Sequence, residues 1–271
     1  MQNLSVALEL ESVAAGRLRL DVKGSLATLT LNRPDAYNSF TIQMYRDFAS
    51  ICGLVDAQPS IRALLLVSST ERAFASGTDI NEFRDFTEAE DALAYERVID
   101  QTLTQLESCR VPTIAALSGV CAGGGFAIAA CCDIRIAQQN LRLGLPMAKT
   151  LGNCLSIENV ERFSGLMGAA RLKELLFTAR LISAAEARDW GLVSEVLPDW
   201  EQLLAHAESL ASRIASLAPI TLEVSKLELL RLRGGGKPEA RDLVARAYSS
   251  ADFREGLTSF LGKRAPMWRG E

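Results

Sequence analysis

Residues 114–137 read IAALSGVCAGGGFAIAACCDIRIA, and this stretch decides the fold. It overlaps an uncharged run of 22 residues, from Val111 to Cys132, which is long enough for a transmembrane helix. The run also contains Pro112 and four glycines, which interrupt a continuous apolar helix. The stretch therefore predicts a buried strand, a glycine turn and the start of a buried helix.

Strands and helices alternate on the N-terminal side of this stretch. The alternating segments RLRLDV and LATLTL, separated by a turn at Lys23 and Gly24, predict a β-hairpin. Thr41 is expected to cap an amphipathic helix, and ALLLVSS is typical of a fully apolar strand. Thr87 and Glu90 form the pattern of a capping box for the next helix. This alternation predicts an α/β fold with right-handed crossovers and a mostly parallel sheet.

The last third of the chain has a different pattern, with helix after helix from about Ser156. A second capping box is predicted at Ser183 and Glu186, followed by the short strand LVSEVL. Further helices are expected to begin near Asp199, Pro219 and Pro238, and the glycines at 234–236 are expected to form a turn. A helical region is therefore predicted to follow the sheet.

The composition excludes several functional classes. Of 271 residues, 48% are apolar and 23% are charged, as in a globular protein with a buried core. Twenty-nine Lys and Arg against 33 Asp and Glu leave a net charge of −4, which provides no general attraction to nucleic acid or to an anionic membrane. The single histidine, His206, lies in a helical pattern and the six cysteines lack a CxxC spacing, so no metal site is expected. Reduced cysteines and an N-terminus, MQNLSVALELESVAAG, without a basic region favour a cytoplasmic protein.

Two segments have the pattern of a functional site, AFASGTDI at 73–80 and the glycine turn at 123–125. Each places glycine directly after a predicted parallel strand, at the end of an α/β sheet where ligands usually bind. The first backbone N–H groups of a helix are unpaired, and two of them can converge on one oxygen that gains negative charge. The two turns together therefore predict a backbone site for such an oxygen.

The glycines allow two other interpretations. A phosphate loop of the form GxxxxGK[ST] is excluded because Phe126 stands where its lysine would be, and the spacing does not match GxGxxG. The remaining alternative is that three glycines only allow a helix to pack closely on a strand. Spacing alone does not separate this alternative from an anion site.

Five separated segments resemble successive signatures of the enoyl-CoA hydratase/isomerase, or crotonase, superfamily. They are LNRPDAYNSF, AFASGTDINEF, PTIAALSGVCAGGGFAIAACCDIRIA, RLISAAEARDWGLVSEVL and FREGLTSFLGKRAPMW. They occur in the family's order and at its spacing over about residues 17–269. The resemblance implies an α/β crotonase (ClpP-like) spiral of ββα units over residues 1–198 and a C-terminal helical trimerisation region over residues 199–271.

The resemblance also implies an enzyme that acts on an acyl-CoA thioester and assembles as a homotrimer or a dimer of trimers. No separate cofactor is expected, because coenzyme A enters as part of the substrate. The backbone N–H groups of Thr78 and Gly124 would hold the thioester oxygen while an enolate forms. The residues expected to contact the substrate or its CoA are Ala36, Ala75, Asp79, Ile80, Gly123, Pro146, Met147 and, at a phosphate, Lys263.

Two positions depart from the family pattern. Hydratases of this family use two glutamates, and the matching positions here are Ala127 in GGGFA and Met147 in LPMAK. Neither side chain can move a proton, so hydration by the two-glutamate route is not expected.

Three hypotheses for the reaction remain. In the first, another carboxylate is the single base, and the candidates are Glu158 and, beside it, Glu161 and Glu82. Acidic residues early in a helix also interact favourably with the helix dipole, which would explain them without any catalytic role. In the second, a malonyl-type thioester is decarboxylated, which needs no base because the oxyanion hole stabilises the product enolate. In the third, the chain is a non-catalytic CoA-binding scaffold.

Overall fold

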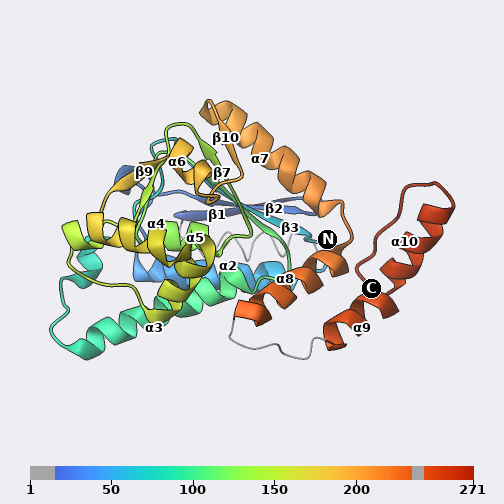
Figure 1. Ribbon diagram of the computed structural model, residues 1–271, viewed down its shortest axis with the longest axis horizontal. Coiled ribbons are helices and arrows are strands. Elements are labelled where there is room, and N and C mark those ends of the chain that lie inside the picture. The colour runs from blue at the N-terminus through green and yellow to red at the C-terminus, as the bar shows by residue number, and fades with distance from the viewer. Residues whose placement is uncertain (1–15, 234–240) are drawn as a thin grey trace.

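The computed structural model describes residues 16–233 and 241–271, which form two β-sheets surrounded by helices (Figure 1). Strands and helices alternate up to the last strand, and the chain is helical after it, as predicted. Residues 1–15, the glycine turn at 234–236 and the helix start near Pro238 lie outside the described residues.

The larger sheet has six strands in the order β1-β2-β3-β5-β7-β10. Their bounds are β1 (Leu18–Lys23), β2 (Leu26–Leu31), β3 (Ala63–Ser68), β5 (Thr113–Leu117), β7 (Ile134–Gln138) and β10 (Glu195–Leu197). β1 and β2 pair antiparallel across a turn in which Gly24 has a φ of +59°, and every later pair is parallel. The predicted hairpin and the mostly parallel sheet are confirmed.

The smaller sheet has four strands in the order β4-β6-β8-β9. Their bounds are β4 (Ala73–Ala75), β6 (Val120–Ala122), β8 (Arg142–Gly144) and β9 (Leu181–Ser183). β4, β6 and β8 are parallel to one another, and β9 runs antiparallel to β8.

Three consecutive units each place one strand in the larger sheet, one in the smaller sheet and then a helix. The units are β3-β4-α3 (α3, Ala89–Glu107), β5-β6-α4 (α4, Gly124–Cys131) and β7-β8-α5 (α5, Ile157–Thr178). Short 3₁₀ helices occur at η1 (Pro34–Ala36), η2 (Ile80–Phe83) and η3 (Met147–Lys149). The spiral of ββα units is therefore confirmed. Ala75 pairs with Cys121, and Ala122 pairs with Gly144, so the segments that follow β4, β6 and β8 lie side by side.

The uncharged run at 111–132 is not one helix. It contains β5, β6 and the whole of α4, with Gly119 at a φ of +54° turning the chain between the two strands. No helix within residues 16–233 and 241–271 is both long and apolar enough to cross a membrane.

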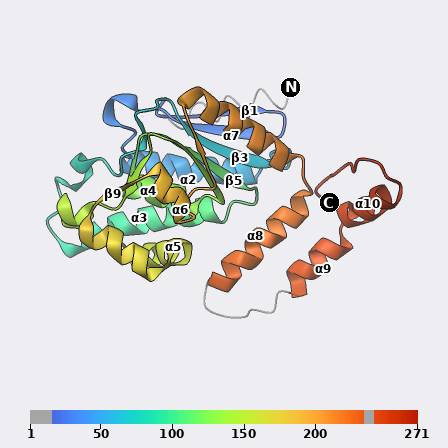
Figure 2. The same cartoon turned by 45° about the horizontal axis from the view of Figure 1, so that its top comes forward.

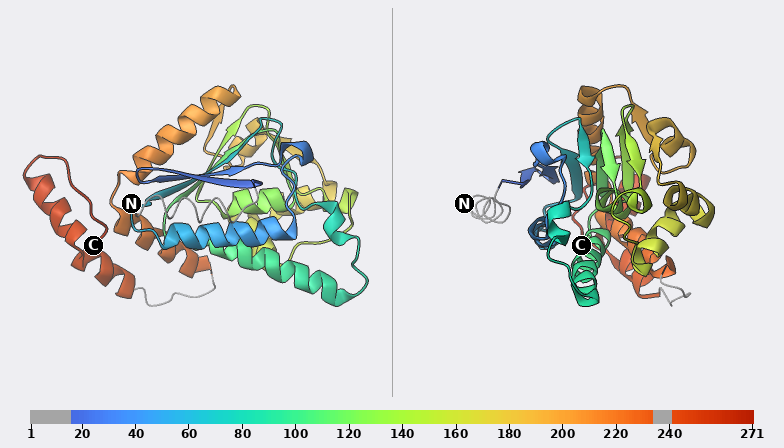
Figure 3. Two further views of the ribbon diagram at one scale, coloured as in Figure 1. Left: turned by 180° about the vertical axis from the view of Figure 1, so that it is seen from behind. Right: turned by 90° about the vertical axis from the view of Figure 1, so that its left-hand side faces the viewer.

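Both faces of the larger sheet are covered, which explains its uninterrupted apolar strands. In β3, Leu64 and Leu66 belong to the main core, whereas Leu65 and Val67 belong to a second cluster formed with α7 (Trp200–Ala215). Successive side chains of a strand point to opposite faces, so ALLLVS has no exposed face. Figure 3 shows α7 across one side of the sheet and α2 (Ile42–Asp56) with α3 on the other.

One predicted helix cap is wrong. The capping box expected at Thr87 and Glu90 is displaced by one residue, because α3 has Glu88 at its N-cap. The Asp91 carboxylate accepts hydrogen bonds at 2.9 Å from the backbone N–H groups of Thr87 and Glu88. Neighbouring acidic residues offer the same acceptor to the first turn, so the sequence pattern is ambiguous by one position. The caps predicted at Thr41 and Ser183 are confirmed, and Ser183 caps α6 (Ala184–Asp189). The helix expected to begin near Asp199 begins at Trp200, with Asp199 as its N-cap.

The C-terminal helices α8 (Pro219–Arg233), α9 (Arg241–Ser249) and α10 (Ala251–Leu261) form an arm beside the body of the molecule (Figure 2). Two ion pairs fasten α8 to the body: Lys226 Nζ lies 2.8 Å from Asp133 Oδ2, and the Arg233 guanidinium binds the Glu107 carboxylate. The division of the chain at residue 198 stays a prediction. α7, which follows that boundary, packs on the larger sheet.

Candidate active site

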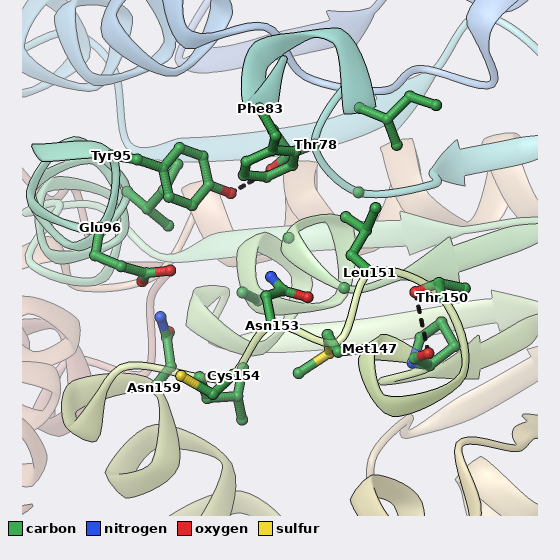
Figure 4. A pocket seen from close by; sticks show the side chains of 18 of the residues that line it. Thr78, Phe83, Tyr95, Glu96, Met147, Thr150, Leu151, Asn153, Cys154 and Asn159 are labelled. Carbon is green, nitrogen blue, oxygen red and sulfur yellow. Dashed lines mark hydrogen bonds between the residues drawn. The ribbon is translucent and has the colours of Figure 1, made fainter. Parts of the chain in front are cut away.

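A cavity of about 230 Å³ opens where the segments after β4, β6 and β8 meet α3 (Figure 4). Its lining comes from residues 76–159. The lining residues are Ser76, Gly77, Thr78, Ile80, Phe83, Tyr95, Glu96, Ile99, Gly123, Gly124, Ala127, Pro146, Met147, Thr150, Leu151, Asn153, Cys154, Leu155 and Asn159. The two predicted glycine turns are therefore brought together at one site.

The turn after β4 is held by Phe40. Phe40 N–H donates to Gly77 O, and Asp79 N–H donates to Phe40 O, both at 2.8 Å. These bonds fix the residues on both sides of Thr78. The Thr78 N–H itself donates to no backbone carbonyl within the described residues, so it is unpaired at the cavity wall.

The three glycines of the second turn each have a different structural reason. Gly123 has a φ of +51°, which favours glycine. A Cβ on Gly125 would overlap the Ala75 carbonyl, so this glycine allows α4 to approach β4 closely. A Cβ on Gly124 would overlap the hydroxyl of Tyr45. Close packing is thus part of the explanation, as the alternative interpretation predicts, but it does not account for the position of the Gly124 N–H.

Gly124 is the first residue of α4, where a helix leaves its N–H groups without intrahelical partners. No backbone carbonyl of residues 16–233 or 241–271 accepts from the Gly124 N–H. The two turns abut, since a Cβ built on Gly77 would lie 3.7 Å from Gly124 N. Both free N–H groups therefore border the same part of the cavity, and the start of α4 adds its favourable dipole. This arrangement can bind an oxygen that gains negative charge.

The positions matching the two family glutamates form an apolar part of the lining. Ala127 is 4% exposed and Met147 is 9% exposed, and both contact the cavity. Neither can donate or accept a proton. Two of the three carboxylates proposed from the sequence, Glu158 and Glu161, are exposed on the first turns of α5, and none of the three, Glu82 included, lines the cavity.

The cavity does contain one carboxylate that the sequence analysis missed. Glu96, on α3, points toward the space between Tyr95, Asn153 and Asn159 (Figure 4). Burial, together with the nearby carboxylates of Asp100 and Glu158, raises the pKa of Glu96 to about 7. A signal was present in the sequence: Glu96 lies three residues before Ile99 and seven before Leu103, on one helix face.

Three hydroxyl groups meet beside the Thr78 turn. Thr78 Oγ1 lies 3.0 Å from the hydroxyl of Tyr45 on α2 and 2.6 Å from the hydroxyl of Tyr95 on α3. Tyr45 is fully buried, whereas Thr78 and Tyr95 line the cavity. Burial raises the pKa of both tyrosines, that of Tyr95 to about 12, so both phenols remain protonated at neutral pH.

The residues expected to contact the substrate divide into two groups. Ile80, Gly123, Pro146 and Met147 line the cavity, together with Thr78 and Gly124, whereas Ala36, Ala75, Asp79 and Lys263 do not. The Asp79 carboxylate instead lies 2.7 Å from the Arg33 guanidinium and accepts a hydrogen bond from Asn81 N–H. Lys263 is exposed just after α10, on the C-terminal arm. The roles assigned to all of these residues stay predictions.

His206 and the cysteines lie in separate surroundings within the described residues. His206 lies on α7, with Nε2 3.1 Å from Glu195 Oε2. Cys154 is exposed at the cavity, and the other five cysteines are buried as free thiols. In the part of the chain that the structure describes, no three His, Cys, Asp or Glu side chains are grouped as a metal ion would require.

The chain is similar to known proteins of one family. The family model described as enoyl-CoA hydratase/isomerase matches residues 21–271. The chain belongs to the enoyl-CoA hydratase/isomerase family. A probable enoyl-CoA hydratase of Mycobacterium bovis is 34% identical over 244 residues, covering 89% of this chain and 93% of the relative. A short-chain-enoyl-CoA hydratase of Clostridium acetobutylicum is 32% identical over 249 residues, covering 90% of this chain and 94% of the relative.

Solved structures of the enoyl-CoA hydratase/isomerase family have the same architecture. An enoyl-CoA hydratase/carnithine racemase from Magnetospirillum magneticum superposes with a TM-score of 0.89 at 34% identity, covering 94% of this chain and 96% of that one. An enoyl-CoA hydratase from Bacillus anthracis gives a TM-score of 0.85 at 30% identity, covering 94% and 100%. The crotonase fold predicted from the sequence is therefore confirmed.

Proposed function

We propose that this protein is an enzyme that moves a proton on the carbon chain of an enolisable acyl-CoA thioester. Glu96 is its single base, and the N–H groups of Thr78 and Gly124 bind the thioester oxygen. Coenzyme A enters as part of the substrate. The observation that carries the proposal is one carboxylate with a pKa of about 7, lining the same cavity as two unpaired backbone donors.

In the reaction that this arrangement favours, a 3-enoyl thioester becomes a 2-enoyl thioester. The Glu96 carboxylate takes a proton from carbon 2, and the electron pair of that C–H bond moves toward the thioester oxygen to give a dienolate. The protonated Glu96 then returns the proton to carbon 4, and the double bond forms between carbons 2 and 3. One carboxylate suffices because it is first base and then acid.

Magnitudes from other enzymes make this division of work reasonable. An oxyanion donor contributes about 3–4 kcal/mol to the stabilisation of the transition state. A positioned base contributes about 10²–10⁴-fold in rate. A pKa of about 7 leaves both forms of Glu96 populated near neutral pH, as a group that alternately accepts and donates a proton requires.

The apolar lining at Ala127 and Met147 supports isomerisation over hydration. Adding water across a double bond requires a group that activates the water as well as a group that protonates carbon 2. The lining holds one carboxylate, so a second carboxylate that could share this work is missing from the described part of the cavity.

The test is an incubation of the purified full chain with 3-hexenoyl-CoA in D₂O, followed by chromatography and mass spectrometry. We expect 2-hexenoyl-CoA with deuterium on the carbon chain, and we expect Glu96→Gln to lose this activity while the control Glu161→Gln retains it. Glu161 is exposed on α5 and does not line the cavity. Conversion by Glu96→Gln at the wild-type rate would refute the assignment of the base.

Two further substrates separate the alternatives. A gain of the mass of water on crotonyl-CoA would show hydration and contradict the proposal. Loss of CO₂ from methylmalonyl-CoA, without isomerisation of 3-hexenoyl-CoA, would select decarboxylation. Thioester binding without turnover of any of the three would select a non-catalytic scaffold.

We also propose that the chain works as a homotrimer or a dimer of trimers in the cytoplasm. Support comes from large apolar side chains that are exposed on the C-terminal arm, among them Leu229, Tyr248, Phe260 and Leu261 at 65–82% exposure. Such a concentration of exposed apolar groups is typical of an interface. Sedimentation equilibrium at micromolar concentration should give a mass of three or six chains, and a monomer would contradict the proposal.

A further inference from the structure

The hydroxyl groups of Tyr45, Thr78 and Tyr95 form a short chain that the reaction above does not use. Thr78 Oγ1 is in the middle, 3.0 Å from the Tyr45 oxygen and 2.6 Å from the Tyr95 oxygen. At each contact either oxygen could be the donor. The chain therefore has two hydrogen bonds and three hydroxyl protons.

One of these three protons is not used by the two hydrogen bonds inside the chain. Each hydrogen bond uses one proton, so two of the three are used inside the chain and the third must point elsewhere. Both phenols keep their protons at neutral pH, because burial raises their pKa values. The leftover proton is thus a permanent donor of a neutral hydroxyl.

Tyr45 cannot hold the leftover proton without a large cost. Its side chain is fully buried, and Thr78 is its one hydrogen-bond partner within residues 16–233 and 241–271. A buried donor without an acceptor costs about 1–3 kcal/mol, so Tyr45 donates to Thr78. The leftover proton consequently belongs to Thr78 or Tyr95, and both of these residues line the cavity.

Tyr95 is the better terminal donor. If Thr78 accepts from Tyr45 and donates to Tyr95, all three dipoles point the same way, and each bond strengthens the next. The phenol at the end is also more acidic than an alcohol and so donates more strongly to an oxygen that gains negative charge. Figure 4 shows the Tyr95 hydroxyl inside the cavity, directed toward Thr78.

The chain lies directly beside the backbone donor of α4. A Cβ on Gly124 would overlap the Tyr45 hydroxyl and would lie 3.4 Å from Thr78 Oγ1. Thr78 carries both the middle hydroxyl of this chain and one of the two N–H groups that are proposed to bind the thioester oxygen, so that oxygen would be an acceptor in the part of the cavity that Tyr95 also lines.

We infer that the Tyr95 hydroxyl donates a third hydrogen bond to the thioester oxygen, and that Tyr45, through Thr78, is the positioning residue that directs this proton into the cavity. The inference rests on the proposed function in one respect, that an acyl thioester occupies the cavity. It does not depend on Glu96 being the base.

The test measures the substrate carbonyl without turnover. Butyryl-CoA labelled with ¹³C at the thioester carbon is saturated, and its carbonyl stretch in infrared difference spectra falls in frequency with each hydrogen bond that the oxygen accepts. We expect the band of the wild-type complex to lie below that of free butyryl-CoA, and the band of Tyr95→Phe to move part of the way back. Tyr248→Phe, which removes a phenolic hydroxyl on α9 outside the cavity lining, is the matched control and should leave the band in place.

The role of Tyr45 gives a second, more specific expectation. Without Tyr45, Thr78 no longer has to donate to Tyr95, and the Tyr95 proton can turn back to Thr78. Tyr45→Phe should therefore shift the band less than Tyr95→Phe does, and it should cause no additional shift in the Tyr95→Phe background. Additive shifts of the two substitutions would overturn the directed chain.

Turnover supplies an independent readout. If the third hydrogen bond strengthens as the enolate forms, Tyr95→Phe should lower kcat for isomerisation by about 10- to 100-fold with little change in KM, and the pH midpoint set by Glu96 should not move. An unshifted carbonyl band in Tyr95→Phe that still binds butyryl-CoA would overturn the inference alone. Failure of the wild-type protein to bind butyryl-CoA would overturn the inference and the proposed function together, whereas a Tyr95-dependent band in a protein without isomerase activity would overturn only the proposed base chemistry.

Discussion

Two walls of the same cavity differ in the groups that they present to it. The wall formed by the Thr78 and Gly124 turns supplies backbone N–H groups, whose positions depend on strand ends, on the bonds to Phe40 and on glycines at tight contacts. The facing wall supplies a side chain, Glu96, from a long helix. A backbone donor cannot be moved without rebuilding the fold, whereas a carboxylate can be provided from any element that reaches the cavity.

The largest effect is expected when one backbone donor is removed. Because a Cβ at position 124 would overlap the Tyr45 hydroxyl, the comparison is made in a Tyr45→Phe background, where that hydroxyl is absent. Gly124→Pro deletes the N–H, and proline is tolerated at the first position of a helix such as α4. Gly124→Ala has a Cβ but keeps the N–H. We expect kcat of the proline variant to be about 10²–10³-fold below that of the alanine variant.

Circular dichroism and thermal melting establish that both Gly124 variants are folded before their rates are compared. Equal isomerisation rates for alanine and proline at position 124 would show that this N–H does not act on the substrate. The backbone wall would then be no more than a packing device, as the glycine spacing alone allows.

The next largest effect is expected in the pH dependence of the reaction, which tests the wall that carries Glu96. Burial and neighbouring carboxylates place the pKa of Glu96 at about 7, and only the ionised form accepts a proton. We expect kcat/KM for isomerisation to rise about tenfold per pH unit below 7 and to level off above it. A profile measured on the wild-type protein with its midpoint near 4.5, the ordinary value for glutamate, would contradict a buried base.

The smallest effect tests the source of that pKa. The Glu158 carboxylate contributes to the raised pKa of Glu96 although it is exposed on α5. Glu158→Gln should lower the midpoint of the pH profile and increase kcat/KM at pH 6 by about twofold or less, because solvent screens an exposed charge. Glu161→Gln, one helical turn away and not among the groups that act on Glu96, should leave the midpoint unchanged. An identical midpoint in Glu158→Gln and wild type would remove Glu158 from the explanation.

The backbone wall was predictable from the sequence because its requirements leave marks there. Glycines directly after predicted strands, at Gly77 and at 123–125, indicated both turns, and the parallel sheet implied that strand ends meet at one edge. The strands, the β-hairpin and most helix starts followed from local patterns of apolar and capping residues. These features depend on interactions between residues that are close in the sequence.

Glu96 and the hydroxyl chain depend on contacts between distant residues, and for that reason the sequence analysis did not find them. On α3, Glu96 shares a helix face with Ile99 and Leu103, but this spacing indicates only a position near the core and does not show that the side chain faces a cavity. Tyr45 occupies a buried position whose pattern indicates packing alone. Its hydroxyl gains significance only through the approach of Thr78, 33 residues later in the chain. The position of Glu158 early in a predicted helix does not show which elements of the fold meet at the cavity.

The parallel pairing of β4, β6 and β8 affects how such a site can change over evolutionary time. Each strand end presents its next residues to one shared cavity, and the two backbone donors are held by strand pairing and Phe40 rather than by the side chains at 127 or 147. Substitution of the side chains at 127 and 147, or of a cavity-facing residue on α3, can therefore leave the two backbone N–H groups in place. The chemistry of the cavity can thus change by side-chain substitution while the scaffold that holds the backbone N–H groups stays the same.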